Sequence, residues 1–250
     1  MNGIVHSGDT WSEQEGADEG VGAGVFETVG ARDGSMPLWP RHLHRMRAAA
    51  RRLGLPWRPP TDLEVRVRAC LELHQHDVAR VRLLRLGAGC TWSVHTRRRD
   101  QEGEPLRVEL TDAPRPVGGA DACKVWPRPW LAAARATARR RGAHDALMWR
   151  GDLVLEATAY NVFVLVGGEL RTPPADGQVL TGIGRAALLR ARLPAVEAPV
   201  SLSELHASEL VLLVNSVYGP RLAAVAGQAA VRDHPLLVRA RTAWRRVVGP

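Results

Sequence analysis

The chain has 250 residues, of which 45% are apolar and 24% are charged. This length fits one large domain or two small ones with a sizeable core, and the composition excludes a mainly disordered chain. No apolar run reaches the ~18 residues that a membrane span needs. The first twenty residues carry five acidic groups and no apolar segment typical of a secretory signal. We therefore expect a cytoplasmic protein that does not contact membranes.

The basic excess of this chain points to no particular partner. The net charge is +8 and the isoelectric point is near 10.7. A nucleic-acid-binding protein would show such a balance, but here arginines are spread through every segment, and no basic block contains interleaved aromatic residues. We therefore expect no nucleic-acid partner.

The metal-binding residue types are scattered. Cys70, Cys90 and Cys123 form no CxxC pair, so the sequence predicts neither a disulfide framework nor a zinc site. His42 and His44 are two residues apart on an expected helix and point to different faces. We predict no metal site.

The first half of the chain alternates strand and helix signals. Glycine followed by β-branched and aromatic residues predicts a strand over residues 23–31. Leu43, Met46, Ala50 and Leu53 recur at spacings of three and four, as on the buried face of a helix. The expected elements are strands over 23–31, 78–86 and 106–110 and helices over 40–53 and 61–74.

A proline- and glycine-rich stretch over residues 113–119 is the best candidate for a linker. It would separate an N-terminal α+β subdomain (1–112) from a C-terminal α+β subdomain (120–250). Gly167-Gly168 predicts a tight hairpin turn. In this half we expect helices over 128–141, 185–193 and 235–247 and strands over 153–157, 161–166, 169–172 and 210–214.

Lys124 is the only lysine, whereas the chain has many arginines. Arginine stays protonated, but lysine can lose its proton and form an imine with a carbonyl compound. The neighbours Cys123, Val125 and Trp126 are apolar, and desolvation would lower the pKa of the amine. This pattern favours a covalent role for Lys124, although one lysine could also survive by chance.

Two further features each allow two interpretations. Glu156 interrupts an apolar strand, so its carboxylate either faces solvent or is buried with a cationic partner such as a pyridinium nitrogen. The turn Thr181-Gly182-Ile183-Gly184-Arg185 opens a helix, whose N-terminal N–H groups either bind a phosphate or are merely capped.

Taken together, these residues resemble the fold type IV pyridoxal-phosphate-dependent enzymes, which include branched-chain aminotransferases, D-amino acid aminotransferases and 4-amino-4-deoxychorismate lyases. The similarity spans about residues 22–228. Each motif alone is weak, but all occur in the family's order around the only lysine. The motifs are Gly24-Val25-Phe26-Glu27-Thr28 with Asp33-Gly34, His42-Leu43-His44-Arg45-Met46, Lys124, Gly142-Ala143-His144-Asp145-Ala146-Leu147, Glu156, Asn161-Val162-Phe163, Thr172-Pro173 and Leu180-Thr181-Gly182-Ile183-Gly184-Arg185.

The resemblance implies two α+β subdomains with pyridoxal 5'-phosphate in the cleft between them, usually in a homodimer. Lys124 would bind the cofactor's aldehyde and later shuttle the substrate proton. Glu156 would pair with the ring nitrogen and keep the ring an electron sink. Phe26 would line the substrate pocket. The phosphate would be held by Arg45, Ile183, Gly184, Asn215 and Ser216.

Within this family the pattern is most similar to that of the lyases. Branched-chain aminotransferases usually carry a tyrosine five residues after the lysine, where this chain has Pro129. Arg85 followed by a Gly-Ala-Gly run resembles a lyase segment, which makes Arg85 a candidate to bind a substrate carboxylate. We expect a lyase that converts 4-amino-4-deoxychorismate to 4-aminobenzoate and pyruvate for folate biosynthesis. The alternative is an aminotransferase acting on D-amino acids or branched-chain amino acids.

Overall fold

The protein is represented by a computed structural model, which divides into two compact units. Unit 1 comprises Met1–Gln101 and Gly119–Pro129, and unit 2 comprises Glu102–Gly118 and Trp130–Pro250. The structure describes residues 4–6, 23–86, 89–99, 104–112, 123–191, 193–228, 231 and 233–249.

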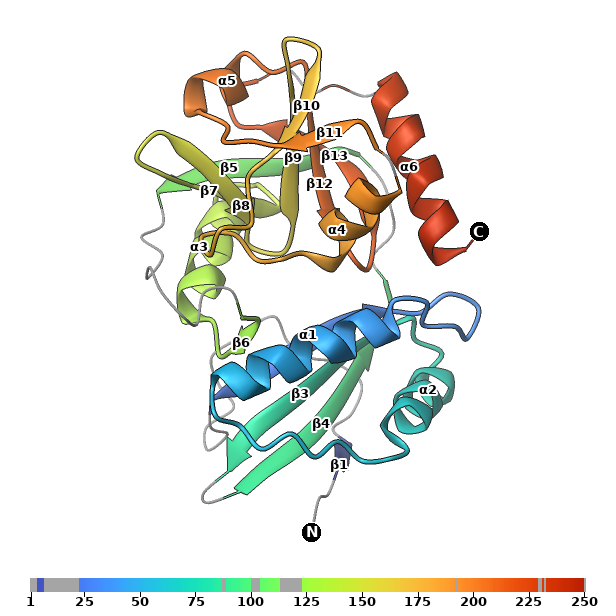
Figure 1. The fold of residues 1–250 in the computed structure, drawn as a ribbon. Helices are drawn as coiled ribbons and strands as arrows, with labels where there is room; N and C mark the ends of the chain where they lie inside the picture. The colour runs from blue at the N-terminus through green and yellow to red at the C-terminus, as the bar shows by residue number, and fades with distance from the viewer. Residues whose placement is uncertain are drawn as a thin grey trace. The chain divides into compact units, whose positions relative to one another are not determined.

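The described residues of unit 1 form a five-stranded sheet with two helices (Figure 1). Strands β2, β3 and β4 are antiparallel neighbours, β6 adds an antiparallel edge beside β2, and β1 pairs parallel with β4. The sequence-based strands over 23–31 and 78–86 and both helices are confirmed. The elements are β1 (Ile4–His6), β2 (Gly24–Gly30), α1 (Trp39–Arg52), α2 (Leu63–His74), β3 (Val78–Leu86), β4 (Gly89–Arg97) and β6 (Val125–Trp126).

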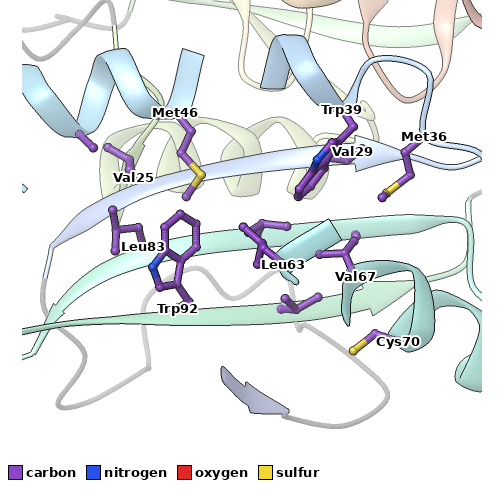
Figure 2. Close-up of a cluster of buried hydrophobic side chains, with 14 of the residues drawn as sticks. Val25, Val29, Met36, Trp39, Met46, Leu63, Val67, Cys70, Leu83 and Trp92 are labelled. Atoms are coloured by element: carbon purple, nitrogen blue, oxygen red, sulfur yellow. The ribbon is translucent and has the colours of Figure 1, made fainter. Parts of the chain in front are cut away.

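The two faces of the unit 1 sheet differ in what covers them. On one face Val25, Leu83 and Trp92 pack with Met46 of α1 and Val67 of α2 in a hydrophobic cluster, which Figure 2 shows. Successive strand residues point to opposite faces. The other face therefore carries a separate apolar cluster of Phe26, Leu84 and Trp126.

The boundary between the two units differs from the expected one. Strand β5 (Leu106–Asp112) was expected in the N-terminal subdomain, but it pairs with β13 (Gly219–Val225) and β7 (Asp145–Arg150) of unit 2. Strand β6 follows Lys124, which was expected in the C-terminal subdomain, but it pairs with β2 of unit 1. Sheet partners decide the unit to which a strand belongs, and a proline- and glycine-rich stretch does not reveal them. The expected linker over 113–119 lies outside the described residues.

In unit 2, the part of the chain that the structure describes forms an eight-stranded sheet of order β11-β10-β9-β12-β13-β5-β7-β8 with four helices. Strands β9 and β12 form its buried centre, where Phe163 lies opposite Leu212. None of the described helices is long and apolar enough to cross a membrane. The elements are α3 (Pro129–Arg140), β5, β7 (Asp145–Arg150), β8 (Leu153–Ala157), β9 (Asn161–Val166), β10 (Glu169–Thr172), α4 (Ile183–Arg190), β11 (Ala195–Glu197), α5 (Leu202–His206), β12 (Leu210–Asn215), β13 (Gly219–Val225) and α6 (Pro235–Val248).

Candidate active site

Lys124 is fixed at the edge of the unit 1 sheet. Its carbonyl oxygen accepts a hydrogen bond from the backbone N–H of Phe26 at 3.0 Å, and the next residue, Val125, pairs with Val25. The Nζ atom lies 4.5 Å from the centre of the Phe26 ring. The backbone pairing therefore holds the amine of Lys124 against an aromatic ring.

The surroundings of Lys124 favour its neutral amine. The pKa of Lys124 is lowered from its ordinary value to about 7, chiefly because burial disfavours the charged form. The positive charges of Arg128, Arg45 and Arg80 act in the same direction, whereas the carboxylate of Glu27 opposes them. Near neutral pH a large fraction of Lys124 is therefore unprotonated and able to attack a carbonyl carbon.

The face of the sheet that carries Phe26 is aromatic and cationic. Phe26 and Trp126 meet edge to face, with ring centres 5.7 Å apart. The guanidinium carbon of Arg80 lies 5.3 Å from the centre of the Phe26 ring, and that of Arg82 lies 4.7 Å from the centre of the Trp126 ring. Both arginines are buried. Such a surface suits an anionic ligand with a planar group.

Arg85 does not share this face. In β3, Arg82 lies opposite Phe26, and Arg85 is three residues further on, so its side chain points to the other side of the sheet. Arg85 is exposed, and its Nη2 lies 3.5 Å from the carbonyl oxygen of Gly54. The structure therefore does not bring together Arg85 and Phe26, the two residues predicted to bind substrate.

Arg45 belongs to a buried cluster with Glu27 and His42. Two nitrogens of Arg45, Nε and Nη2, donate to the two carboxylate oxygens of Glu27 at 2.8 and 2.7 Å. His42 Nδ1 lies 2.7 Å from Glu27 Oε2. Burial alone raises the pKa of Glu27, but the charge of Arg45 and the hydrogen bonds of Arg45 and His42 outweigh it and lower this pKa to about 2. Glu27 is therefore ionised at every pH at which the protein would work.

In unit 2, Glu156 is buried in β8, with an exposed fraction of 3%. Its Oε2 accepts hydrogen bonds from Asn161 Nδ2 at 3.0 Å and from the backbone N–H of Leu180 at 3.1 Å. Of the two interpretations that the sequence allowed, the structure excludes a solvent-facing carboxylate. A buried carboxylate held in this way is suited to pair with a protonated nitrogen.

The glycine turn at the start of α4 is tightly packed. A Cβ at Gly182, the residue before the helix, would overlap Asn161 Oδ1, and a Cβ at Gly184 would lie 2.7 Å from the carbonyl of Asn215. Only glycine lets the chain approach so closely at these positions. The first N–H groups of α4, from Ile183 onward, thus lie beside the end of β12 and can attract an anion.

Asn215 and Arg185 have structural partners. Asn215 Oδ1 accepts from the N–H groups of Val217 and Tyr218 at 3.0 and 2.9 Å, and its Nδ2 donates to the Ala159 carbonyl at 3.2 Å. The side chain of Asn215 thus shapes the turn that presents Ser216. Buried Arg185 donates to the carbonyl of Pro173 at 2.9 Å and to Thr172 Oγ1 at 3.1 Å, and it pairs with Glu197.

Three buried polar residues were not predicted as part of the site. Glu27 and His42 surround Arg45, and Asn161 links Glu156 to the carbonyl of Leu180 at 3.0 Å. The available signal was a polar residue inside an apolar strand, as at Glu27 between Phe26 and Val29. Among the described residues, no group of three or more His, Cys, Asp or Glu side chains is placed to hold a metal ion.

Comparison with known proteins identifies the class of protein that this fold and these residues define. The chain matches the model of the class IV amino-transferase family over residues 24–221, and it belongs to that family. Members of the family are pyridoxal-phosphate-dependent enzymes, either aminotransferases or aminodeoxychorismate lyases. A relative from Schizosaccharomyces pombe, named "Putative aminodeoxychorismate lyase", is 30% identical over 170 residues, which cover 66% of this chain and 72% of the relative.

Solved structures share the fold. A "Putative 4-amino-4-deoxychorismate lyase" from Legionella pneumophila superposes with a TM-score of 0.80 at 21% identity, covering 90% of this chain and 91% of that one. A fold IV transaminase from Curtobacterium pusillum gives 0.77 at 25% identity, with 98% and 90% covered. A structure described as "A hypothetical aminotransferase from Mycobacterium tuberculosis, PLP-bound form" gives 0.78 at 20% identity, with 98% and 95% covered. The expected mixed α+β fold of type IV is confirmed.

Proposed function

We propose that this protein is a pyridoxal-phosphate-dependent lyase that converts 4-amino-4-deoxychorismate to 4-aminobenzoate and pyruvate. The observation that carries the proposal is the amine of Lys124, which has a pKa of about 7 and lies on an aromatic and cationic face. The name of the Schizosaccharomyces pombe relative supports the choice of a lyase.

The residues present fit pyridoxal phosphate. The cofactor, when bound, supplies an electron sink for the negative charge left at the substrate's α-carbon. Lys124 offers a neutral amine to attach the aldehyde and then to move the α-proton. Buried Glu156 offers a carboxylate for a protonated ring nitrogen. For the phosphate, we assign the guanidinium of Arg45 as the ligand from unit 1, and unit 2 by itself offers the backbone N–H groups at the start of α4.

The charge of the lysine's face supports an acidic substrate. Aminodeoxychorismate carries two carboxylates, and a guanidinium binds a carboxylate with two parallel hydrogen bonds. Arg80 and Arg82 lie on the same face as Phe26, whereas Arg85 lies on the other. We therefore assign the substrate carboxylate to Arg82 and Arg80 together, in place of Arg85. Arg82 Nε also donates to Ser93 Oγ at 3.2 Å, and its Nη2 contacts His95.

An aminotransferase is the second candidate. The Curtobacterium pusillum structure, which covers 98% of this chain at 25% identity, is a transaminase. Both reactions need the lysine amine, the carboxylate for the ring nitrogen and a phosphate site. They differ in whether the enolpyruvyl group leaves the substrate or the amino group passes to a keto acid.

The deciding experiment supplies aminodeoxychorismate to the purified holoenzyme without any keto acid and follows pyruvate. We expect stoichiometric release of pyruvate and 4-aminobenzoate, and we expect Lys124→Arg to abolish it, since arginine forms no imine. Product formation that strictly requires 2-oxoglutarate or another amino acceptor would replace the lyase assignment with the aminotransferase.

A further inference from the structure

A buried carboxylate in unit 1 is hydrogen-bonded to protein side chains, one of which is the arginine assigned to the cofactor phosphate. Glu27 has an exposed fraction of 2%, and it joins β2 to α1 through His42 and Arg45. We propose that Glu27 and His42 are positioning residues, which hold the guanidinium of Arg45 in the orientation that binds the phosphate of pyridoxal phosphate. This inference rests on the proposed function, because it assumes a cofactor with a phosphate group.

The contacts of Arg45 fix the plane of its guanidinium. Its Nε and Nη2 donate to the two oxygens of Glu27 at 2.8 and 2.7 Å, which is the side-on, two-bond geometry of an arginine–carboxylate pair. Because the guanidinium is planar and rigid, this pairing directs the Nη1 corner away from Glu27. A long side chain that would otherwise lose rotational freedom on binding is thereby oriented in advance.

His42 fixes the carboxylate without adding charge. An ionised carboxylate only accepts hydrogen bonds, so the proton of the 2.7 Å contact lies on His42 Nδ1. Burial, followed by the positive charges of Arg45 and Lys124, lowers the pKa of His42 even though Glu27 opposes the shift, so the ring is neutral. His42 and Arg45 are three residues apart in α1, which places both on the side that faces Glu27.

The positioning role and simple electrostatics make opposite predictions. Glu27 is a negative charge next to a cation that has to attract a phosphate. If charge alone decided affinity, Glu27→Gln would strengthen binding of pyridoxal phosphate, because it removes a repelling anion. If Glu27 acts by orienting Arg45, the same change weakens binding, because the neutral amide turns one N–H group toward donors and cannot hold the guanidinium with both atoms.

The experiment measures dissociation constants of the apoprotein for pyridoxal phosphate and for pyridoxal, which lacks the phosphate, from the absorbance of the bound cofactor. We expect Glu27→Gln to raise the dissociation constant for pyridoxal phosphate about 10- to 100-fold and to change that for pyridoxal less than about twofold. In the background of Arg45→Met, Glu27→Gln should have no further effect. His42→Leu, which leaves Glu27 and Arg45 in place, should weaken the binding of pyridoxal phosphate by a smaller factor. Thermal unfolding of each apoprotein confirms that it is folded.

Several outcomes would overturn the positioning role. These are tighter or unchanged binding of pyridoxal phosphate by Glu27→Gln, equal losses for both ligands, or an undiminished loss in the Arg45→Met background. If Glu27→Gln does not fold, the His42→Leu measurement decides in the same way. Failure of the unaltered protein to bind either ligand would instead contradict the proposed cofactor.

Discussion

At the scale of single residues, the amine of Lys124 is the group whose environment most clearly favours reaction with an aldehyde. Its pKa of about 7 arises from burial and from nearby arginines, although the side chain as a whole is only half-buried. An ordinary lysine has a pKa near 10.4 and is almost wholly protonated at neutral pH. The structure thus provides the neutral amine that covalent binding of an aldehyde requires.

This lowered pKa predicts the pH dependence of cofactor attachment. Only the neutral amine attacks, so the attachment rate of pyridoxal phosphate to apoprotein should rise with pH, with its midpoint near 7, and then level off. Stopped-flow absorbance over pH 5–10 measures it, beside a lysine peptide in the same buffers as control. A rate that keeps climbing in parallel with the peptide would show that Lys124 has an ordinary pKa.

Glu156 permits a test of the ring-nitrogen contact. Glu156→Gln keeps an oxygen that can accept from Asn161 and Leu180 but removes the negative charge. We expect the cofactor to remain bound while kcat falls about 100-fold, since the charge that stabilises the protonated ring is lost. Steady-state kinetics and cofactor absorbance of the same preparation measure both effects. An unchanged kcat would argue against this contact.

Arg82 and Arg85 form a matched pair for the substrate carboxylate. Arg82 lies on the face of Phe26 and Arg85 on the opposite face, so Arg82→Met should raise KM for the substrate about tenfold and Arg85→Met should not. Initial-rate measurements on both variants, each checked by thermal unfolding, decide between them. The reverse order would restore Arg85 as the carboxylate ligand.

At the scale of secondary-structure elements, the close approach of α4 to β12 holds together the proposed phosphate site. A Cβ at Gly184 would lie 2.7 Å from the Asn215 carbonyl, and backbone cannot move aside as a flexible side chain can. We expect Gly184→Ala to lower the free energy of unfolding by about 1–3 kcal/mol and to weaken the binding of pyridoxal phosphate. Urea denaturation measures the first effect. Arg190→Ala, at the exposed end of α4, is the control and should stay within about 0.5 kcal/mol.

The sequence predicted the long helices and several buried strands, but other strands were not predicted. The helix over 40–53 is present because its apolar spacing reflects its buried face, and the strands over 161–166 and 210–214 are present because their continuous apolar runs are buried on both faces. Strand β4 was not predicted, although apolar Cys90, Trp92 and Val94 alternate with polar residues along it, and in the structure it pairs with β3 over its whole length. The unit to which β6 belongs likewise depends on its pairing with β2, because the two residues after Lys124 carry no sequence signal for the strand that they join.

The sequence predicted which residues carry the chemistry of the candidate site, but it predicted less well where their side chains lie. Lys124 could be singled out because it is the only lysine, and Glu156 because it interrupts an apolar strand. The face on which Arg85 lies depends on the register of β3 against β2, which the sequence did not fix. The bonds from Glu27 to His42 and Arg45 join residues 15 and 18 positions apart, and only the packing of α1 on the sheet brings them together.

At the scale of the whole molecule, family membership covers residues 24–221, which includes every residue assigned to the cofactor and the substrate. The net charge of +8 is compatible with an acidic substrate and a phosphate cofactor. A homodimer and a cytoplasmic location stay predictions. Size-exclusion chromatography of the holoenzyme with light scattering measures the first, and a monomer would contradict it.

Reduction of the pyridoxal-phosphate-loaded protein with borohydride, followed by mass spectrometry of its peptides, identifies the residue that binds the cofactor covalently. We expect the yellow absorbance to disappear and the reduced cofactor to remain covalently bound to Lys124 alone, because this is the only lysine of the chain. A protein that binds no cofactor, or a label found at the N-terminal amine with Lys124 unmodified, would contradict the account.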